Sequence, residues 1–312
     1  MKAVLPAPAR PLLERRLPAD LDPVWFTSPA EANGAIADAE IAWVDMQPTS
    51  RVAETLRHSG PALRWVSTLY AGLDAFPLDL LCERHVLVTN GAGINAIAVA
   101  EYAVLGMLAA AKRFDEVVRA QDRRAWLRDA PGKIELAGTA ALVIGYGAIG
   151  RLVGERLRAF GVAVTGVTRS GRDGTLTPEA WRDRLGAFDW VVLAAPSTEA
   201  TRAMIGPAEL DAMKPSAWLV NIARGDMIDQ NALVEALRSN AIAGAFLDPT
   251  EPEPLPADHP LWSAPNAMLT MHLSGRSQTK MFARAAALFL DNLAAYRAGR
   301  PMTNVVDFEA GY

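Results

Sequence analysis

The chain has 312 residues, about two domains at the usual size of ~150 residues each. Apolar residues make up 51% and charged residues 21%, the ordinary proportions of a globular protein, which excludes a disordered chain. With 31 Lys and Arg against 35 Asp and Glu, the formal net charge is −4, so no positive excess is available to bind nucleic acid or an anionic membrane.

The sequence favours a soluble protein of a reducing compartment. Its single cysteine, Cys82, cannot form an internal disulfide. Prolines interrupt the N-terminal segment Met1–Arg16, so it lacks the apolar core of a signal peptide. The longest apolar stretch, Ala96–Ala111, contains Glu101 and is shorter than the ~20 residues that span a bilayer. We therefore expect a cytoplasmic protein with no membrane partner.

Short β-like runs alternate with helical patterns along most of the chain, which predicts an α/β fold with parallel sheets. In the first third we expect strands at Ile41–Val44, Leu63–Thr68 and Val86–Thr89. The segment Ile97–Lys112, rich in Ala, Val and Leu, predicts a mostly buried helix, and a polar stretch follows it.

A second and more regular series of elements begins at residue 140. The expected strands are Ala140–Ile144, Val162–Val167, Trp190–Ala194, Trp218–Ile222, Ile242–Leu247 and Ala267–Thr270. The expected helices are Ile149–Phe160, Gln230–Ser239 and Met281–Ala298, and the last of these fits either domain by periodicity alone. The domain boundary is expected near the long helix at residues 92–112.

The clearest local signal is an apolar strand that runs into Gly-x-Gly-x-x-Gly at Gly145, Gly147 and Gly150, with a helix directly after it. The first glycine permits a tight turn, the second lets the backbone approach a pyrophosphate, and the third lets the helix pack closely on the strand. Because the strand and the helix are both present, the motif predicts a dinucleotide site rather than a structural turn.

The turn after the next strand indicates which dinucleotide is bound. An NAD site has an acid about 20 residues after the first glycine, where it accepts from the ribose 2′-hydroxyl. This chain has Thr168, Arg169, Ser170 and Arg172 there, and no carboxylate before Asp173. Two guanidiniums and two hydroxyls suit a 2′-phosphate and therefore NADPH, with a solvated basic turn as the alternative.

Three further residues follow strands of the second series and so belong at the carboxyl edge of one sheet, where open α/β sheets bind ligands. They are Arg224, Glu253 and His272. Reduction of a carbonyl builds negative charge on its oxygen, which an arginine stabilises, and a histidinium can supply the proton. A carboxylate beside the histidine would orient it and favour its charged form.

The roles of two of these residues are open to another interpretation. Glu251, two residues from Glu253, has the same chemistry and could take its role, and Arg224 could pair with a nearby aspartate. The other histidines and the cysteine are interpreted as surface, capping or packing residues: His58 at a helix end, His85 before a strand, His259 in a proline-rich loop, and Cys82 as packing filler. No spacing typical of a metal site occurs in the sequence.

Nearly the whole chain resembles the D-isomer-specific 2-hydroxyacid dehydrogenases. The segments that carry the resemblance are Ala71-Gly72-Leu73-Asp74, Val99-Ala100-Glu101-Tyr102, the glycine motif, Val220-Asn221-Ile222-Ala223-Arg224-Gly225, Leu247-Asp248 with Glu253-Pro254-Leu255-Pro256, Leu269-Thr270-Met271-His272, and the tail with Asp291-Asn292-Leu293 and Asn304-Val305-Val306-Asp307.

The resemblance implies two Rossmann-like doubly wound domains, with the active site in the cleft between them. Residues 1–95 with 281–312 would form the substrate domain, and 96–280 the dinucleotide domain. Arg224, Glu253 and His272 would be catalytic, with Glu253 selected over Glu251 because it directly precedes Pro-Leu-Pro. The implied substrate-binding residues are Leu69, Tyr70, Ala71, Gly72, Arg224 and His272. The implied cofactor-binding residues are Gly145, Tyr146, Gly147, Ala148, Ile149, Gly150, Thr168, Arg169, Ser170, Arg172, Ala195, Pro196, Ile222, Ala223, Asp248 and His272.

The basic turn is most similar to glyoxylate/hydroxypyruvate reductases that use NADPH, with NADH as the alternative donor. The resemblance also implies a homodimer formed through the long helix and the Trp126 segment. Met271 replaces the proline usual before the family's histidine, Pro249-Thr250 replace a typical Val-Phe, and Tyr70 is bulkier than usual. Two rival functions on this fold are formate or phosphite oxidation and a dinucleotide-sensing protein similar to corepressors. A Glu–His pair has little use in formate oxidation, and the chain lacks the long extra tails of the corepressors.

Overall fold

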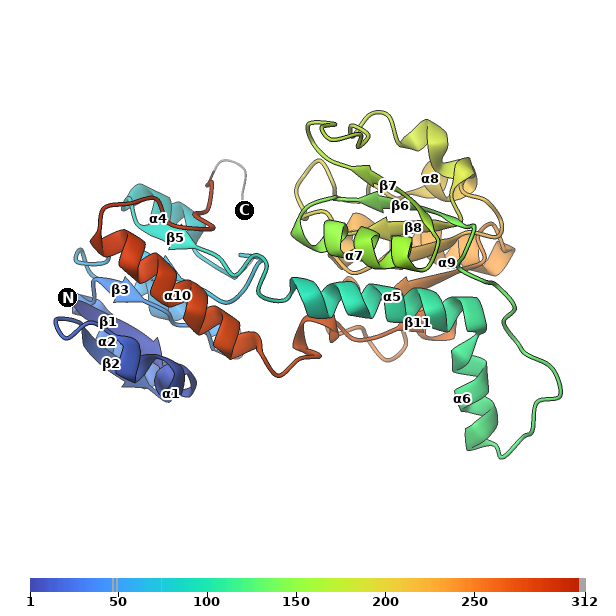
Figure 1. The fold of residues 1–312 in the computed structure, drawn as a ribbon. Coiled ribbons are helices and arrows are strands. Elements are labelled where there is room, and N and C mark those ends of the chain that lie inside the picture. The colour runs from blue at the N-terminus through green and yellow to red at the C-terminus, as the bar shows by residue number, and fades with distance from the viewer. Residues whose placement is uncertain (47, 49, 74, 309–312) are drawn as a thin grey trace. The chain divides into compact units, whose positions relative to one another are not determined.

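The computed structural model describes residues 1–46, 48, 50–73 and 75–308. Contacts within the chain divide it into two compact units. The first unit comprises Met1–Asn95 and the segment from Gln278 onward, and the second comprises Ala96–Ser277. Figure 1 shows both units as sheets covered by helices. Among the described residues no helix is long and apolar enough to cross a membrane.

The described part of the first unit contains a five-stranded parallel sheet in the order β2-β1-β3-β4-β5. Its strands are β1 (Lys2–Pro6), β2 (Asp22–Phe26), β3 (Ile41–Ala42), β4 (Trp65–Ser67) and β5 (Leu87–Thr89). Its α-helices are α1 (Arg10–Leu13), α2 (Pro29–Ala35), α3 (Ser50–Arg57), α4 (Leu78–Glu83) and α10 (Met281–Arg297). This strand order is doubly wound, and its direction reverses between β1 and β3.

Helices cover both faces of this sheet, so its strands are buried on both sides. Helices α2, α3 and α4 contribute Ala32, Val52, Leu56 and Leu81 to the core on one face. On the other face α10 inserts Phe289 between two tryptophans of the sheet. The Phe289 ring stacks on Trp65 with centroids 5.1 Å apart and lies 5.6 Å from Trp43. These contacts place the last helix in the first unit, which periodicity alone left open.

The described part of the second unit contains a six-stranded parallel sheet in the order β11-β10-β9-β8-β6-β7. Its strands are β6 (Ala140–Ile144), β7 (Ala163–Val167), β8 (Trp190–Leu193), β9 (Trp218–Asn221), β10 (Gly244–Leu247) and β11 (Ala267–Leu269). Its α-helices are α5 (Ala96–Lys112), α6 (Phe114–Asp122), α7 (Ala148–Ala159), α8 (Pro207–Ala212) and α9 (Gln230–Ser239). The order reverses between β6 and β8, so a ligand crevice is expected at the carboxyl ends of these strands.

The core of the second unit also lies on both faces of its sheet. Helices α5 and α7 cover one face, and α8 and α9 cover the other (Figure 1). The apolar runs of β6, β8 and β9 supply side chains to both cores, and this continuous hydrophobicity is typical of central parallel strands. The two-domain α/β fold expected from the sequence is therefore confirmed.

Several elements of the structure were not predicted from the sequence. The proline-containing N-terminal segment forms β1, and β2 and α6 were also missed. In β1 the proline is the last residue, and the prolines of the short helices that follow lie in the first turn, where a missing N–H costs nothing. Strand β11 is a half-buried strand at the edge of its sheet.

Candidate active site

The loop after β6 requires glycine at two positions. Gly145 has a φ of +94°, and a Cβ there would lie 2.3 Å from the amide nitrogen of Ala195. A Cβ on Gly150 would lie 2.2 Å from the carbonyl oxygen of Gly145. The amides of Gly145 and Tyr146 donate to the Val167 carbonyl at 3.1 and 2.8 Å, which ties the turn to the end of β7. The turn therefore has the close backbone packing that a dinucleotide-binding loop needs.

The outer side of the same loop is open. A Cβ on Gly147 would meet nothing within 4 Å, and Gly147 is the N-cap of the twelve-residue helix α7. No acidic side chain occurs in the first turn of this helix. Because the first N–H groups of a helix carry partial positive charge, the backbone at Gly147, Ala148 and Ile149 fits the pyrophosphate of a dinucleotide.

Tyr146, expected at the cofactor, packs its side chain against the protein. A Cβ on Gly154 would lie 2.4 Å from the Tyr146 hydroxyl oxygen, and a Cβ on Gly166 would lie 2.4 Å from the Tyr146 ring. The Tyr146 hydroxyl accepts a hydrogen bond from Nη1 of Arg158 at 2.7 Å. The side chain of Tyr146 therefore supports the loop from α7 and β7.

The turn after β7 is basic and exposed, as its sequence indicated. Arg169, Ser170 and Arg172 are all exposed. The Thr168 hydroxyl is hydrogen-bonded to that of Thr175 at 2.7 Å and accepts from the Gly171 amide at 3.1 Å, which shapes the turn. The carboxylate in this turn, on Asp173, lies 3.6 Å from a guanidinium nitrogen of Arg151. The turn thus presents cationic side chains where a ribose-binding acid would stand.

The loops after β8 and β9 complete this edge of the sheet. Ala195 packs against Gly145, and Pro196 beside it is exposed. Ile222 and Ala223 are buried directly after β9. All four residues therefore lie at the carboxyl end of the sheet, where the sequence placed the cofactor.

Arg224 is held by an asparagine whose role the sequence reading did not assign. The buried Asn221 accepts from the Ala223 amide at 3.0 Å and donates to the Arg224 carbonyl at 2.7 Å. The Arg224 guanidinium donates to the Ala223 carbonyl at 2.8 Å. The backbone at Arg224 is thereby fixed where β9 ends.

Glu253 and His272 form a hydrogen-bonded pair. Nδ1 of His272 lies 2.9 Å from Oε2 of Glu253, and both side chains are about two-fifths exposed, at 41% and 40%. Burial is the largest influence on Glu253 and raises its pKa. The hydrogen bond and charge of His272, the Thr250 amide and the charge of Arg224 outweigh it, so the pKa of Glu253 lies below its usual range. The structure thus brings the three predicted side chains together in the second unit.

Asp248, one of the expected cofactor-binding residues, organises the loop that carries His272. Its buried carboxylate accepts from the Thr270 hydroxyl at 2.8 Å and from the Leu273 amide at 2.9 Å. The Asp248 carbonyl accepts from the His272 amide at 2.7 Å. These contacts fix the backbone on both sides of the histidine.

The residue before the histidine has a backbone that proline cannot adopt. Met271 and His272 have φ values of +50° and +55°, in the left-handed region that few residues other than glycine occupy. Proline is fixed near −65°. The backbone at position 271 therefore accommodates methionine but not the proline that is usual in the family.

The predicted substrate loop, Leu69–Gly72, lies in the first unit at the carboxyl end of β4. Leu69 is buried and Ala71 is exposed. The Gly91 amide donates to the Tyr70 carbonyl at 2.8 Å, and the Asn90 side chain donates to the Ala71 carbonyl at 3.3 Å. Asp74, the last residue of the motif, lies outside the described residues.

Comparison with known proteins identifies the family. The model of the D-isomer specific 2-hydroxyacid dehydrogenase NAD-binding domain matches residues 104–274. A glyoxylate reductase of Aeropyrum pernix is 34% identical over 274 residues, which cover 84% of this chain and 81% of the relative. The chain belongs to the D-isomer-specific 2-hydroxyacid dehydrogenase family. It is accordingly an oxidoreductase with an NAD-binding domain.

Solved structures of this dehydrogenase family have the same fold. A D-isomer specific 2-hydroxyacid dehydrogenase family protein from Aeromonas salmonicida is 29% identical with a TM-score of 0.88, over 98% of this chain and 99% of that one. The NADPH-dependent glyoxylate/hydroxypyruvate reductase from Sinorhizobium meliloti, in complex with NADP and malonate, is 26% identical with a TM-score of 0.79, over 98% and 97% of the two chains.

The remaining histidines of this dehydrogenase occupy turns and caps. His58 follows α3, His85 lies in an exposed turn, and His259 caps a short 3₁₀ helix by accepting from the Leu261 amide at 3.2 Å. Cys82 is exposed, so its interpretation as packing filler was wrong. Within the described ranges, no group of three or more His, Cys, Asp or Glu residues could hold a metal ion.

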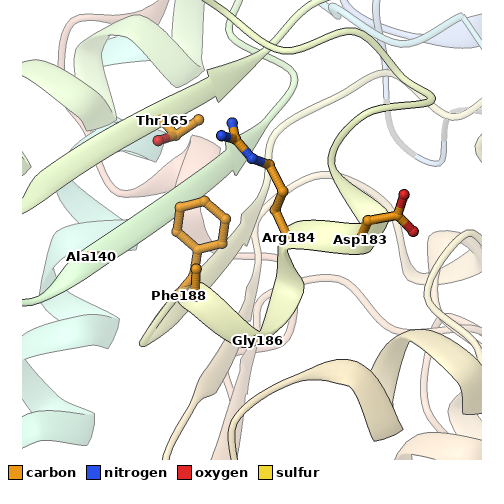
Figure 2. Close-up of a pocket in the computed structure, with 7 residues that line it drawn as sticks. Ala140, Thr165, Asp183, Arg184, Gly186 and Phe188 are labelled. Atoms are coloured by element: carbon orange, nitrogen blue, oxygen red, sulfur yellow. The ribbon is translucent and has the colours of Figure 1, made fainter.

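One surface pocket of the second unit lies away from these loops. It has a volume of about 470 Å³ and is lined by residues that include Ala140, Thr165 and Phe188. Figure 2 shows Arg184 pointing across it toward Thr165. Ala140 begins β6 and Phe188 precedes β8, so the pocket lies at the amino ends of these strands. It therefore does not belong to the candidate active site.

Proposed function

We propose that this protein reduces a small 2-oxoacid of the glyoxylate or hydroxypyruvate class to the D-2-hydroxyacid, with NADPH as the preferred hydride donor. The observation that carries the proposal is the 2.9 Å hydrogen bond between His272 and Glu253. The charge of Arg224 also acts on Glu253, whose pKa it lowers. The named activities of the reductases from Aeropyrum pernix and Sinorhizobium meliloti support the same substrate class.

The three side chains have separate roles in the proposed reaction. When bound, NADPH supplies the hydride to the carbonyl carbon of the substrate. Arg224 orients the substrate carboxylate and stabilises the negative charge that develops on the carbonyl oxygen. His272 gives that oxygen a proton from Nε2, because Nδ1 is directed at Glu253. Glu253 acts through His272 by holding and stabilising the imidazolium.

The first unit would bind the carboxylate of the substrate through backbone amides. Leu69 and Tyr70 shape the loop, and Ala71 and Gly72 would donate the hydrogen bonds. No described residue accepts a hydrogen bond from the amide of Ala71 or Gly72, and both residues have some exposed surface. Two adjacent N–H groups suit an anion of this size.

A turnover assay tests the function directly. Glyoxylate, hydroxypyruvate and phenylpyruvate are supplied in turn, with NADPH and NADH in parallel. Reduction of at least one small oxoacid, faster with NADPH, supports the proposal. Turnover of formate but of no oxoacid would contradict it, as would nucleotide binding without any turnover.

We also propose that the protein is a homodimer in the cytoplasm, where the exposed Cys82 would stay reduced. Trp126 is 94% exposed. Other exposed apolar side chains on α5, α6 and the next segment are Ile97, Leu105, Phe114, Val117, Val118, Leu127 and Ile134. Within the second unit, α6 extends away from the sheet (Figure 1). An apolar surface of this extent is typical of an interface, and a twofold dimer would bury it against its own copy.

Light scattering in solution should therefore give about twice the chain mass of 33.5 kDa. Val118→Glu combined with Trp126→Glu should shift the protein to a monomer, because the charges would be buried without partners. Phe160→Glu, at an exposed position after α7, is the matched control and should remain dimeric. A monomeric mass for the unmodified protein at micromolar concentration would contradict the proposal.

A further inference from the structure

Asp45 is a carboxylate of the first unit that sequence reading did not single out. It follows β3, at the same end of the sheet as the substrate loop after β4. Its Oδ2 accepts from the Leu69 amide at 2.6 Å and from the indole nitrogen of Trp43 at 2.7 Å. Its Oδ1 accepts from the Thr68 hydroxyl at 2.6 Å. Both oxygens are therefore committed to donors of the same unit.

The contacts of Asp45 extend along the substrate loop through Thr68. The hydroxyl of Thr68 donates to Asp45 and accepts from the Tyr70 amide at 3.0 Å. The amides at positions 69 and 70 are thus both held, while Asn90 and Gly91 hold the carbonyls of Ala71 and Tyr70 on the opposite side. The next two amides, at Ala71 and Gly72, have no acceptor among the described residues.

The surroundings of Asp45 suit a carboxylate that accepts hydrogen bonds from within the protein. Burial is the largest effect and raises the pKa of Asp45 to about 6, against the lowering effect of the Leu69, Thr68 and Trp43 donors. At neutral pH the group is then ionised, and a carboxylate has enough lone pairs for three donors. A carboxylate on the surface would accept its hydrogen bonds from water, whereas Asp45 accepts them from three groups of the protein.

We propose that Asp45 is a positioning residue for the carboxylate of the 2-oxoacid: through Leu69 and Thr68 it holds the loop so that the amides of Ala71 and Gly72 point at the substrate. The inference rests on the proposed function, because it assigns those amides to the substrate carboxylate. Asp45 itself does not touch the substrate. Its effect is on binding of the anion and not on proton transfer.

The test compares variants of Asp45 and of Thr68, the two partners of one hydrogen bond. Asp45→Ala leaves three donors without their acceptor, so we expect the KM for glyoxylate to rise at least about tenfold. Asp45→Asn can still accept from Leu69 and Trp43 and can donate to Thr68, so it should recover most of the affinity. Thr68→Val should raise KM about three- to tenfold, whereas Thr68→Ser, which keeps the hydroxyl, should not. Asp22→Asn removes an exposed carboxylate of the same unit and is the control.

A binding measurement separates this inference from the proposed function. The dissociation constant of oxalate, a dicarboxylate that resembles the oxoacid, is measured by calorimetry on the protein saturated with NADP. Asp45→Ala should weaken oxalate binding by the same factor as KM, with kcat and the NADP dissociation constant changed less than threefold. If the unmodified protein binds oxalate but reduces no oxoacid, the proposed function fails, and the oxalate series still decides the role of Asp45.

Two outcomes would overturn the inference. One is unchanged oxalate affinity in Asp45→Ala. The other is an equal loss of oxalate binding, NADP binding and kcat in Asp45→Ala and Thr68→Val, with no recovery in Asp45→Asn, which would indicate a general structural role.

Discussion

The His272→Ala variant should lose about 10²- to 10⁴-fold in kcat/KM for the 2-oxoacid, the usual loss when an acid–base catalyst is removed. In the proposed reaction the imidazole delivers a proton to the carbonyl oxygen while its other nitrogen is held 2.9 Å from Glu253. Steady-state reduction of glyoxylate or hydroxypyruvate, with a separate measurement of cofactor affinity, checks the loss. Cofactor affinity should change little, because the glycine loop is intact.

The pH dependence gives a second readout of the same residue. In the proposed reaction the imidazolium donates a proton to the oxoacid, so kcat/KM for the oxoacid should fall as pH rises. The reverse oxidation needs the neutral imidazole as base, so it should rise over the same range. The pKa of Glu253 lies below its usual range, so this carboxylate is already ionised at neutral pH and does not cause the transition.

Variants of the neighbouring groups separate their roles. Glu253→Gln removes the counter-charge, so it should keep the shape of the pH profile but shift it to lower pH. Arg224→Ala should lower activity without moving the profile, because a guanidinium is charged at every accessible pH. His85→Asn, in an exposed left-handed turn that asparagine tolerates, is the histidine control. Near-normal turnover and an unchanged profile in His272→Ala would assign the proton to another group.

Sequence periodicity predicted the second unit well, because its central strands are continuous apolar runs between helices with clear apolar faces. The strand Ala140–Ile144 and the helix Gln230–Ser239 were located with their observed bounds. Strands β1 and β2 were missed because each contains a proline, which argues locally against a strand. Both prolines are tolerated: one ends β1, and β2 is the edge of its sheet. Which strand lies at the edge of a sheet depends on the tertiary fold, so the local sequence around a proline does not show it.

The catalytic candidates could be predicted because parallel strands end at one edge, and Arg224, Glu253 and His272 each follow such a strand. The choice between Glu251 and Glu253 could not be made from residue chemistry, and here only Glu253 is hydrogen-bonded to the histidine in the described structure. Asp45 satisfies the same rule in the first sheet. It was overlooked because β3 is two residues long and the loop it holds is 24 positions away in the sequence.

Replacement of both Arg169 and Arg172 by alanine should remove the preference for NADPH. Each charged contact to a phosphate contributes on the order of 1.5–3 kcal/mol, so each lost contact should lower kcat/KM with NADPH about 10- to 100-fold. NADH lacks the 2′-phosphate, so its kcat/KM should stay nearly constant. The measurement is the ratio of the two values for one oxoacid, together with the dissociation constants of NADP and NAD.

The control for this pair is Arg184→Ala, which removes an exposed guanidinium of the same unit at the opposite end of the sheet (Figure 2). It tests whether general loss of positive charge weakens binding of an anionic cofactor, an effect that salt screens. The double variant should lose the preference at all ionic strengths, whereas the control should keep it. If the NADPH-to-NADH ratio is the same in the double variant and the unmodified protein, the basic turn is a solvated surface feature and the phosphate is bound elsewhere.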